Sequence, residues 1–160
     1  MQKHTISLLV DNEPGVLARV SGLFSGRGFN IESLCVAETL DPSVSRITLV
    51  TRGDDAVAEQ ISKQLNKLIN VIKVTDLTLT ECVEREMALI KVSAKADFRA
   101  EILRIVDIFR CKVVDVSPTH YTIEVTGTAE KLAAIVSLLK PMGIKEIART
   151  GAIALPREKK

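Results

Sequence analysis

The sequence predicts an α+β protein built from two successive βαββαβ units. Short β-branched runs alternate with segments whose apolar residues recur at helical spacing, and the same order of elements occurs twice within 160 residues. A polar stretch from Thr80 to Arg85 separates the two copies, so we expect one domain at 1–79 and another at 80–160. This element order is that of the ferredoxin-like, split βαβ fold, here in tandem.

The first copy opens with an apolar run at 5–10, which we expect to be a strand. The residue types from Asp11 to Gly15 favour a turn. Pro14 suits the first position of a helix because its missing N–H costs nothing there. Gly26 and Gly28 are expected to end that helix. Strands are predicted at 31–38, 45–51 and 71–79. The two helices are marked by apolar stripes: Val16, Leu17, Val20, Leu23 and Phe24, then Val57, Ile61, Leu65 and Leu68.

The second copy repeats this order with its own stripes and strands. Its strands are predicted at 87–92, 113–116, 121–125 and 144–148, and its helices are marked by Phe98, Ile102, Ile105, Val106, Phe109 and by Leu132, Ile135, Val136, Leu139. Each half is marginal in size for an independent core. Because helices cover one face of each antiparallel sheet, the other face or the edges need a partner. We therefore expect an oligomer, with a two-domain monomer as the alternative.

Composition excludes several classes of function. The net charge is +2 and aromatics make up 3% of the chain, with Tyr121 the single tyrosine, which disfavours nucleic-acid binding. The apolar runs are shorter than the ~20 residues of a membrane helix. Three distant cysteines, Cys35, Cys82 and Cys111, are expected to be reduced and partly buried. With no signal-peptide pattern at Met1 to His4, the expected location is cytoplasmic.

Catalytic and metal-binding patterns are missing from the sequence, so we expect neither catalytic residues nor metal ligands in this chain. His4 is expected to be solvated near the terminus and His120 to lie in a hairpin. The glycines Gly22, Gly26 and Gly28 come toward the end of a predicted helix instead of between a strand and a helix start, which disfavours a phosphate loop. The acidic residues Glu81, Glu84 and Glu86 are interpreted as a solvated linker. The charged tail 157–160 is expected to be disordered.

The turn from Asp11 to Gly15 is the one place in the sequence where several groups suited to binding a ligand are expected to come together. The first N–H groups of a helix lack internal acceptors and, with the helix dipole, favour a carboxylate. Gly15 permits close approach, while Asn12 and Asn30 each offer a donor and an acceptor. An amino acid needs this mixture together with an apolar wall, which we assign to Val10, Leu17 and Ile31. The alternative is a plain helix start capped by Asp11 or Asn12.

The second copy lacks this combination. Its equivalent segment, 94–99, reads AKADFR and contains neither glycine nor asparagine. The two halves are therefore expected to share a fold without sharing the ligand site.

At the turn the first half resembles an ACT domain, the amino-acid-sensing module of many biosynthetic enzymes. Residues 8–20 (LLVDNEPGVLARV) and 23–34 (LFSGRGFNIESL) resemble, more specifically, the small regulatory subunit of acetohydroxyacid synthase (acetolactate synthase). Shorter matches at 41–46, 64–68, 83–86 and 108–110 extend the resemblance over nearly the whole chain.

This resemblance implies a non-catalytic subunit of branched-chain amino acid biosynthesis. The large subunit would carry thiamine diphosphate, Mg²⁺ and often FAD, and this chain would hold no cofactor. It would activate that subunit and confer feedback inhibition, typically by valine, as a homodimer through its ACT domains. The effector-binding positions that the resemblance implies are Asn12, Gly15 and Asn30, with Val10 and Ile31 alongside and Pro14, Val16 and Leu17 in the same turn and helix start.

Two other interpretations remain open at this point. One is a free-standing amino-acid-binding module that acts on a different enzyme or on a transcription factor. The other is a small enzyme of ferredoxin-like fold, which the missing catalytic constellation disfavours.

Overall fold

The computed structural model describes residues 1–159. Contacts within the chain divide it into two compact units. The first unit comprises Met1–Val83 together with the C-terminal segment from Gly151 onward, and the second comprises Glu84–Thr150. Each unit is described by itself below.

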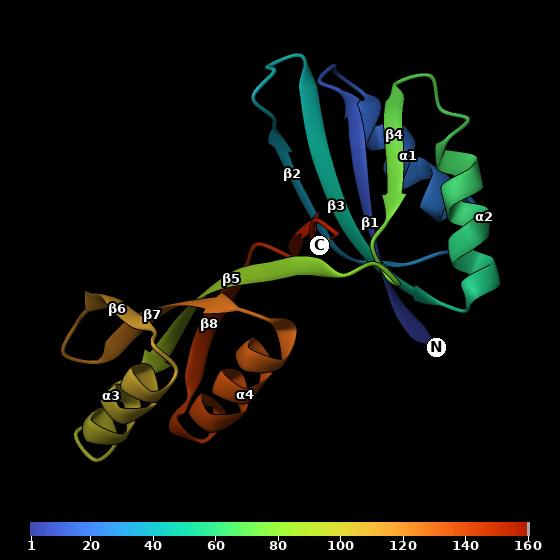
Figure 1. The fold of residues 1–160 in the computed structure, drawn as a ribbon. Helices are drawn as coiled ribbons and strands as arrows, with labels where there is room; N and C mark the ends of the chain where they lie inside the picture. Colours follow the sequence, from blue (N-terminus) through green and yellow to red (C-terminus); the bar gives the residue numbers. More distant parts are fainter. Residues whose placement is uncertain (160) are drawn as a thin grey trace. The chain divides into compact units, whose positions relative to one another are not determined.

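The first unit has the predicted βαββαβ order. Its elements are β1 (Gln2–Asp11), α1 (Val16–Gly26), β2 (Ile31–Glu38), β3 (Val44–Gly53), α2 (Asp55–Leu65) and β4 (Val71–Asp76). The strands form an antiparallel sheet in the order β2-β3-β1-β4. Figure 1 shows α1 and α2 on one face of this sheet.

The core of the first unit lies between the sheet and the two helices. Alternate residues of β1 point toward the helices, so Ile6 and Leu8 are fully buried there. Apolar residues of the two helices pack against these strand residues: Val20 and Phe24 of α1 and Ile61 of α2 are buried in the same cluster. Burial of each large side chain stabilises the fold by about 1.5–3 kcal/mol, so the predicted periodicities are also the energetic basis of the unit.

His4 occupies one of these inward-facing positions, and the prediction that it is solvated is wrong. Its side chain is 1% exposed, and its Nε2 lies 3.2 Å from the carbonyl oxygen of Gly53. The reason is that β1 begins at Gln2, three residues earlier than expected, so His4 lies inside the strand next to β3 and not in a loose terminus.

The opposite face of the first sheet is covered by the C-terminal segment. Thr5, Ser7 and Thr48 point to this face and are at most 5% exposed. Gly151 lies so close to β2 that a Cβ on it would stand 3.2 Å from the Cβ of Ser33. The chain passes from the first unit into the second along β5 (Cys82–Ser93), and its last strand is β9 (Ile153–Pro156).

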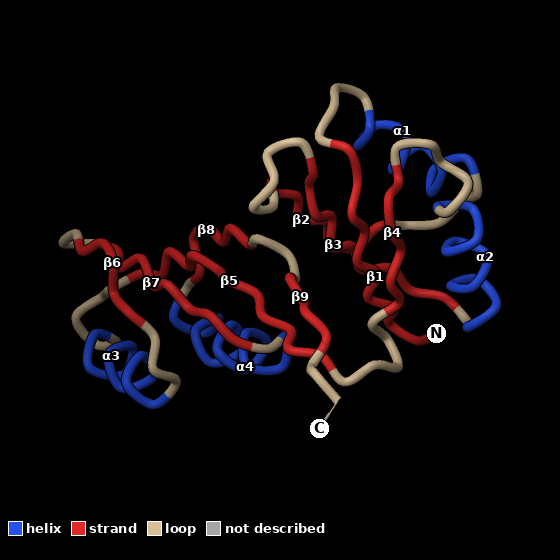
Figure 2. The backbone as a smooth tube through the Cα atoms, turned by 45° about the horizontal axis from the view of Figure 1, so that its top comes forward, coloured by secondary structure: helices blue, strands red, loops and turns tan. Residues whose placement is uncertain are grey.

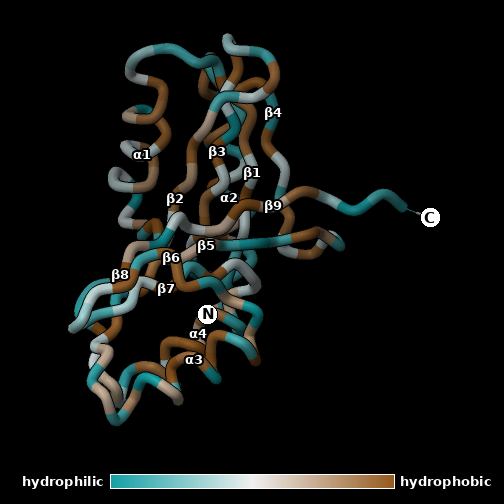
Figure 3. Tube along the Cα trace, turned by 90° about the vertical axis from the view of Figure 1, so that its left-hand side faces the viewer, coloured by the Kyte–Doolittle hydropathy of each residue, from teal (hydrophilic) through white to brown (hydrophobic). Residues whose placement is uncertain are grey.

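Strand β9 is not among the predicted elements. The prediction that residues 157–160 are disordered is wrong for Arg157, whose N–H donates to the Glu81 carbonyl at 2.8 Å. Along the trace, hydrophobic colour over β9 gives way to hydrophilic colour over the charged residues that follow (Figure 3). The apolar residues Ile153 to Leu155 therefore explain the strand. Lys160 lies outside the described residues.

The second unit repeats the order of the first. Its elements are β5, α3 (Arg99–Ile108), β6 (Lys112–Val116), β7 (His120–Gly127), α4 (Ala129–Leu139), the short 3₁₀ helix η1 (Lys140–Met142) and β8 (Ile144–Arg149). The sheet order is β6-β7-β5-β8. In each unit the helices form one layer and the strands another (Figure 2).

The acidic residues assigned to a solvated linker lie partly in β5, which corrects that assignment. Glu84 and Glu86 are strand residues, and Glu86 Oε1 forms an ion pair with Arg149 Nε at 3.3 Å. Charged residues at the start of a strand obscure its alternation of apolar and polar positions.

The three cysteines are free and partly buried, as predicted. Within residues 1–159, no helix is both long and apolar enough to cross a bilayer.

Candidate functional site

The candidate site is the turn that joins β1 to α1. Gly15 is the N-cap residue of α1, with φ of 84° and ψ of −8°, and no side chain caps this helix. The interpretation of Asp11 or Asn12 as the helix cap is therefore wrong, and Pro14 precedes the helix instead of occupying its first position. The Val16 N–H donates to the Glu13 carbonyl at 3.4 Å. The following N–H groups of the first turn have no side-chain acceptor, so these are the groups that an anionic ligand can engage.

Asn12 connects this turn to the β2–β3 hairpin. Its side-chain Nδ2 donates to the Pro42 carbonyl at 2.9 Å and to Glu38 Oε1 at 3.2 Å, and its backbone N–H donates to the Ser43 carbonyl at 2.8 Å. Both side-chain bonds use the amide nitrogen, which fixes the orientation of the group. Within the described chain, the Asn12 side-chain carbonyl oxygen remains open as an acceptor on an exposed side chain.

A second network, around Asn70, holds the other side of the turn. The Asn70 side-chain amide donates to Asp11 Oδ2 at 3.3 Å and to Glu13 Oε2 at 3.4 Å, and it accepts a hydrogen bond from Arg19. The Asp11 N–H donates to the Asn70 carbonyl at 2.9 Å. Sequence reasoning missed Asn70, Arg19 and Glu38 because each meets the turn only through tertiary structure.

The apolar residues predicted for the site divide into two groups. Val10 and Val16 are 2% and 3% exposed and belong to the core beneath the turn. Leu17 is 42% exposed and offers an accessible apolar surface at the start of α1. Val36 of β2, which sequence reasoning missed, is 41% exposed and pairs with Ile47, whose side chain faces the helices. Val36 and Leu17 are thus apolar groups on the helix-bearing side.

Asn30 and Ile31 lie at the opposite end of the sheet from the turn. Ile31 pairs with Thr51, which in turn pairs with His4, whereas Asp11 pairs with Val44. From residue 4 to residue 11, β1 extends about 23 Å at ~3.3 Å per residue. One small ligand therefore cannot contact both Asn12 and Asn30 of a single chain.

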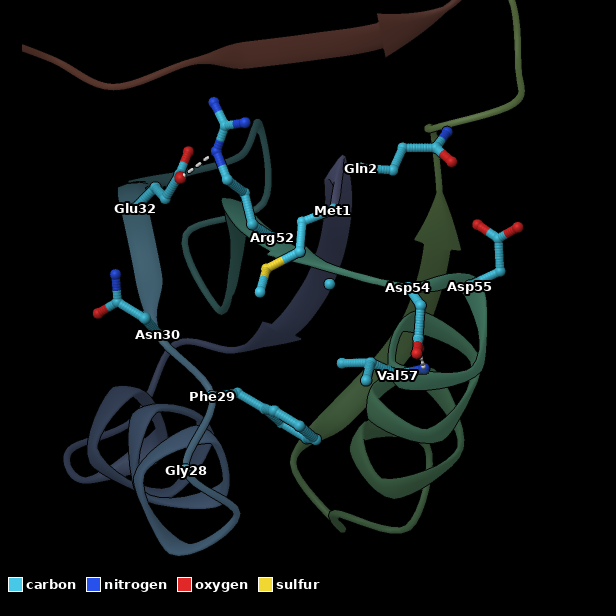
Figure 4. Close-up of a pocket in the computed structure, with 11 residues that line it drawn as sticks. Met1, Gln2, Gly28, Phe29, Asn30, Glu32, Arg52, Asp54, Asp55 and Val57 are labelled. Atoms are coloured by element: carbon cyan, nitrogen blue, oxygen red, sulfur yellow. Dashed lines mark hydrogen bonds and ion pairs between the residues drawn. The ribbon is translucent and has the colours of Figure 1, made fainter.

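A pocket of about 740 Å³ opens at the Asn30 end (Figure 4). Its lining comes from the N-terminus and the start of β1, the α1–β2 connection, the start of β2, the end of β3 and the start of α2. The lining residues are Met1, Gln2, Gly28, Phe29, Asn30, Glu32, Arg52, Gly53, Asp54, Asp55 and Val57. An ion pair between Arg52 and Glu32 lies on one side of it. The backbone carbonyl of Asn30 accepts from Thr51 Oγ1 at 2.7 Å. The Asn30 side-chain amide is exposed and forms no hydrogen bond among residues 1–159.

The described residues show no arrangement suited to metal binding. Within residues 1–159, no three His, Cys, Asp or Glu side chains gather closely enough to hold a metal ion. The turn combines helix N–H groups that lack a side-chain cap, an oriented amide and nearby apolar surface, an arrangement suited to binding.

Comparison with known proteins accounts for the whole chain. Residues 6–73 match the model of the AHAS small subunit-like ACT domain, and residues 85–158 match that of the small subunit of acetolactate synthase. The acetolactate synthase small subunit of Aquifex aeolicus is 55% identical over 159 residues, which cover 99% of this chain and 83% of that protein. The probable acetolactate synthase small subunit of Archaeoglobus fulgidus is 54% identical, with 99% of each chain covered.

A solved structure agrees with these sequence matches. The crystal structure of the acetolactate synthase small subunit from Thermotoga maritima superposes with a TM-score of 0.91 at 45% identity and covers 100% of both chains. The tandem ferredoxin-like fold and the similarity over the full length lead to one conclusion: this chain belongs to the acetolactate synthase small-subunit family, and its first half is an ACT domain.

Proposed function

We propose that this chain is the regulatory subunit of an acetolactate synthase, which activates the catalytic large subunit and makes it sensitive to valine. The observation that carries the proposal is the uncapped start of α1 beside the oriented Asn12 amide, in a chain similar along its whole length to acetolactate synthase small subunits. The sensing site belongs to the ACT domain, for which we keep the bounds 1–79, and the C-terminal half, 80–160, is assigned to stabilising the subunit and contacting its partner.

The chemistry of the turn fits an α-amino acid. The effector carboxylate would accept from the free N–H groups at the start of α1, beside Gly15, where a Cβ would meet no atom within 4 Å and space is therefore open to a ligand. Its ammonium would donate to the open Asn12 side-chain carbonyl oxygen. An aliphatic side chain would pack on Leu17. Selection among aliphatic side chains would be weak, because one methylene is worth only about 1–3 kcal/mol, so leucine or isoleucine could compete with valine.

A complete site requires two copies of the chain, because Asn12 and Asn30 lie at opposite ends of one sheet. Strand β2 is an edge strand, and an edge can pair with a second copy about a two-fold axis. Antiparallel pairing of β2 with itself would place residue 31 of one subunit near residue 38 of the other. Glu38 is hydrogen-bonded to Asn12, so Asn30 of the partner subunit would complete the site.

Inhibition then follows from linkage between two arrangements of the dimer. A ligand shared by two subunits stabilises the arrangement in which both halves of its site meet. If that arrangement supports a less active catalytic subunit, valine lowers the rate by population shift, and the catalytic subunit's own chemistry is unchanged.

The test is a valine titration of this chain by calorimetry, followed by the same titration of the reconstituted holoenzyme's rate. Asn12→Ala and Gly15→Asp should abolish valine inhibition while activation persists, the latter because it places a like charge against the effector carboxylate. Absence of both valine binding and activation would refute the proposal. Valine binding without activation would favour a free-standing sensing module, and turnover by the chain alone would favour an enzyme.

A mixing experiment tests the shared site separately. Asn12→Ala and Asn30→Ala homodimers should each bind valine poorly. A mixed dimer of the two variants would carry one site that lacks both amides and one intact site, so mixing should restore up to half of the binding capacity in the heterodimer. If each site lay within a single chain, mixing would restore nothing.

A further inference from the structure

A second, smaller pocket lies on the sheet face of the first unit that faces away from α1 and α2. Its volume is about 120 Å³. Three adjacent strands, β3, β1 and β4, contribute its floor, and residues after β4 and at the end of β9 complete its lining. The lining residues are Ser7, Leu9, Arg46, Lys73, Thr75, Leu77 and Pro156.

Strand register brings two cations and two hydroxyls together in this pocket. Leu9 pairs with Arg46 on one side and with Lys73 on the other, so the two cationic side chains flank it on the same face. The next row on that face pairs Ser7 with Thr75. These four polar side chains therefore surround the apolar floor that Leu9 provides.

The Arg46 guanidinium is held in place by a buried hydroxyl. Arg46 Nη1 donates to Ser7 Oγ at 2.8 Å, and Ser7 is 3% exposed. In that bond Ser7 is the acceptor, so its own hydroxyl hydrogen is free to donate into the pocket. The remaining N–H groups of the planar guanidinium are available for a second acceptor.

The positive charge of the pocket is not neutralised within the first unit. The lining contains no carboxylate, and within residues 1–159 neither Arg46 nor Lys73 forms an ion pair. Other cations of the same unit do pair, as Arg52 does with Glu32 and Lys63 with Glu59. Two unpaired cations beside two hydroxyl donors form a site for an anion with several oxygens.

The size of the pocket limits the anion to a compact one. With a volume of about 120 Å³, the pocket is small beside the roughly 300–1,000 Å³ of typical ligand pockets. A tetrahedral oxyanion of five heavy atoms fits this space, and its oxygens can engage the guanidinium fork, the ammonium and the hydroxyls simultaneously.

We propose that this pocket, lined by Arg46, Lys73, Ser7 and Thr75, binds inorganic phosphate. The site lies on the sheet face opposite α1, so it is distinct from the amino-acid site and does not depend on the proposed regulatory function. Pro156 forms part of its wall, and bound phosphate therefore contacts the segment that covers this face.

The test is a phosphate titration of the full chain, followed by two-dimensional NMR of backbone amides at constant ionic strength. The amides of Ser7, Leu9 and Thr75 should shift and saturate, while acetate at the same ionic strength should not produce saturation. Lys73→Met should weaken binding about tenfold or more, since it removes one charge-assisted contact. Lys73→Arg should retain binding because it keeps the charge.

The matched control is Lys63→Met, which removes the same charge from α2 of the same unit and should bind phosphate like the unaltered chain. Arg46→Met provides a second variant, with its amide spectrum serving as a check on folding. Shifts that rise linearly without saturation, that acetate reproduces, or that Lys63→Met weakens as much as Lys73→Met does would overturn the proposal.

Discussion

At the scale of single residues, the candidate effector site depends on backbone conformation at Gly15. Its φ of 84° lies in the left-handed region, and a Cβ at this position would meet nothing within 4 Å. A side chain here would therefore be costly because of backbone strain and not because of a clash. Gly22 offers the opposite case, since it lies within the helix, has ordinary φ and is likewise surrounded by open space.

This contrast predicts opposite effects of the same substitution. Gly15→Ala should lower the free energy of unfolding by about 1–2 kcal/mol, whereas Gly22→Ala should raise it by roughly 0.5–1 kcal/mol because alanine favours the helix. Urea unfolding of both variants measures the difference. Equal effects at the two positions would show that the strain at Gly15 is absent.

A substitution at Asn30 should affect valine binding without affecting the stability of the fold. Its side-chain amide is exposed and forms no hydrogen bond within the described chain, since only its backbone carbonyl is engaged. Asn30→Ala should therefore change the free energy of unfolding by less than about 0.5 kcal/mol while it reduces valine binding. Thermal unfolding and calorimetry of the same preparation test both parts, and a large loss of stability would contradict this account.

At the scale of elements, the helices differ in how they begin. The side chain of Asp54 accepts from the Val57 N–H at 2.8 Å and caps α2, and Thr128 caps α4 by accepting from Lys131 at 3.3 Å. Helix α1 begins at Gly15 without such a cap. Helix α3 also begins without a side-chain cap, at Phe98. The missing cap therefore does not by itself mark a ligand site, but at α1 it leaves N–H groups that a ligand beside Asn12 can engage.

The cap of α2 leads to a stability prediction. Asp54→Ala should lower the free energy of unfolding by about 0.5–2 kcal/mol, because the Val57 N–H loses its acceptor. Asp55→Ala, one residue later, removes a carboxylate that forms no cap and should cost less, about 0.3–1 kcal/mol through the helix dipole alone. Chemical denaturation of the two variants compares them, and equal losses would argue against the cap.

The Lys91–Glu146 pair between β5 and β8 leads to a prediction about pH. The hydrogen bond from Lys91 at 2.9 Å, reinforced by its charge, lowers the pKa of Glu146 below its usual 4.5 and raises that of Lys91. Because the folded-state pKa of the carboxyl is depressed, its contribution to stability is present above pH 4.5 and is lost as the pH falls through the lowered value.

A double-mutant cycle of Lys91→Gln and Glu146→Gln should therefore give a favourable coupling at neutral pH that declines as the pH falls below 4.5. Both side chains are exposed, so the coupling should be small and should weaken with added salt. A coupling that persists unchanged when the carboxyl is protonated would contradict the assignment.

At the scale of the whole molecule, the end of the chain completes the first unit. The segment from Gly151 onward belongs to that unit and covers the sheet face that carries Thr5, Ser7 and Thr48. Ala152 and Ala154 are at most 5% exposed within it. The first unit is therefore not a continuous stretch of sequence, although its βαββαβ core is.

Removal of this segment should destabilise the first unit selectively. Truncation after Thr150 should lower its free energy of unfolding by on the order of 1–3 kcal/mol and accelerate amide exchange in β1 and β3, while α4 and β7 of the second unit keep their protection. Hydrogen exchange with mass spectrometry measures this. Truncation after Arg157, which retains the covering residues, is the control and should leave exchange in β1 and β3 unchanged.

Much of the fold follows from local patterns, because each element carries its own periodicity. The stripe Val16, Val20, Phe24 and the alternation in β1 both predict the buried faces that the structure shows. Positions governed by distant neighbours are predicted less well. Local pattern places His4 in solvent because its burial depends on β3, and it places Glu86 in a linker because its partner, Arg149, lies far along the chain.

Local sequence patterns predict the order of the elements, the two cores and the position of the turn that ends in Gly15, since these depend on residues close together in the chain. The opposite placement of Asn12 and Asn30 in one sheet, the contacts of Asn70 with the turn and the covering of the first sheet by the C-terminal segment emerge only from the folded chain. The physical reason is that strand register and edge pairing depend on contacts between segments far apart in sequence, which no local pattern encodes.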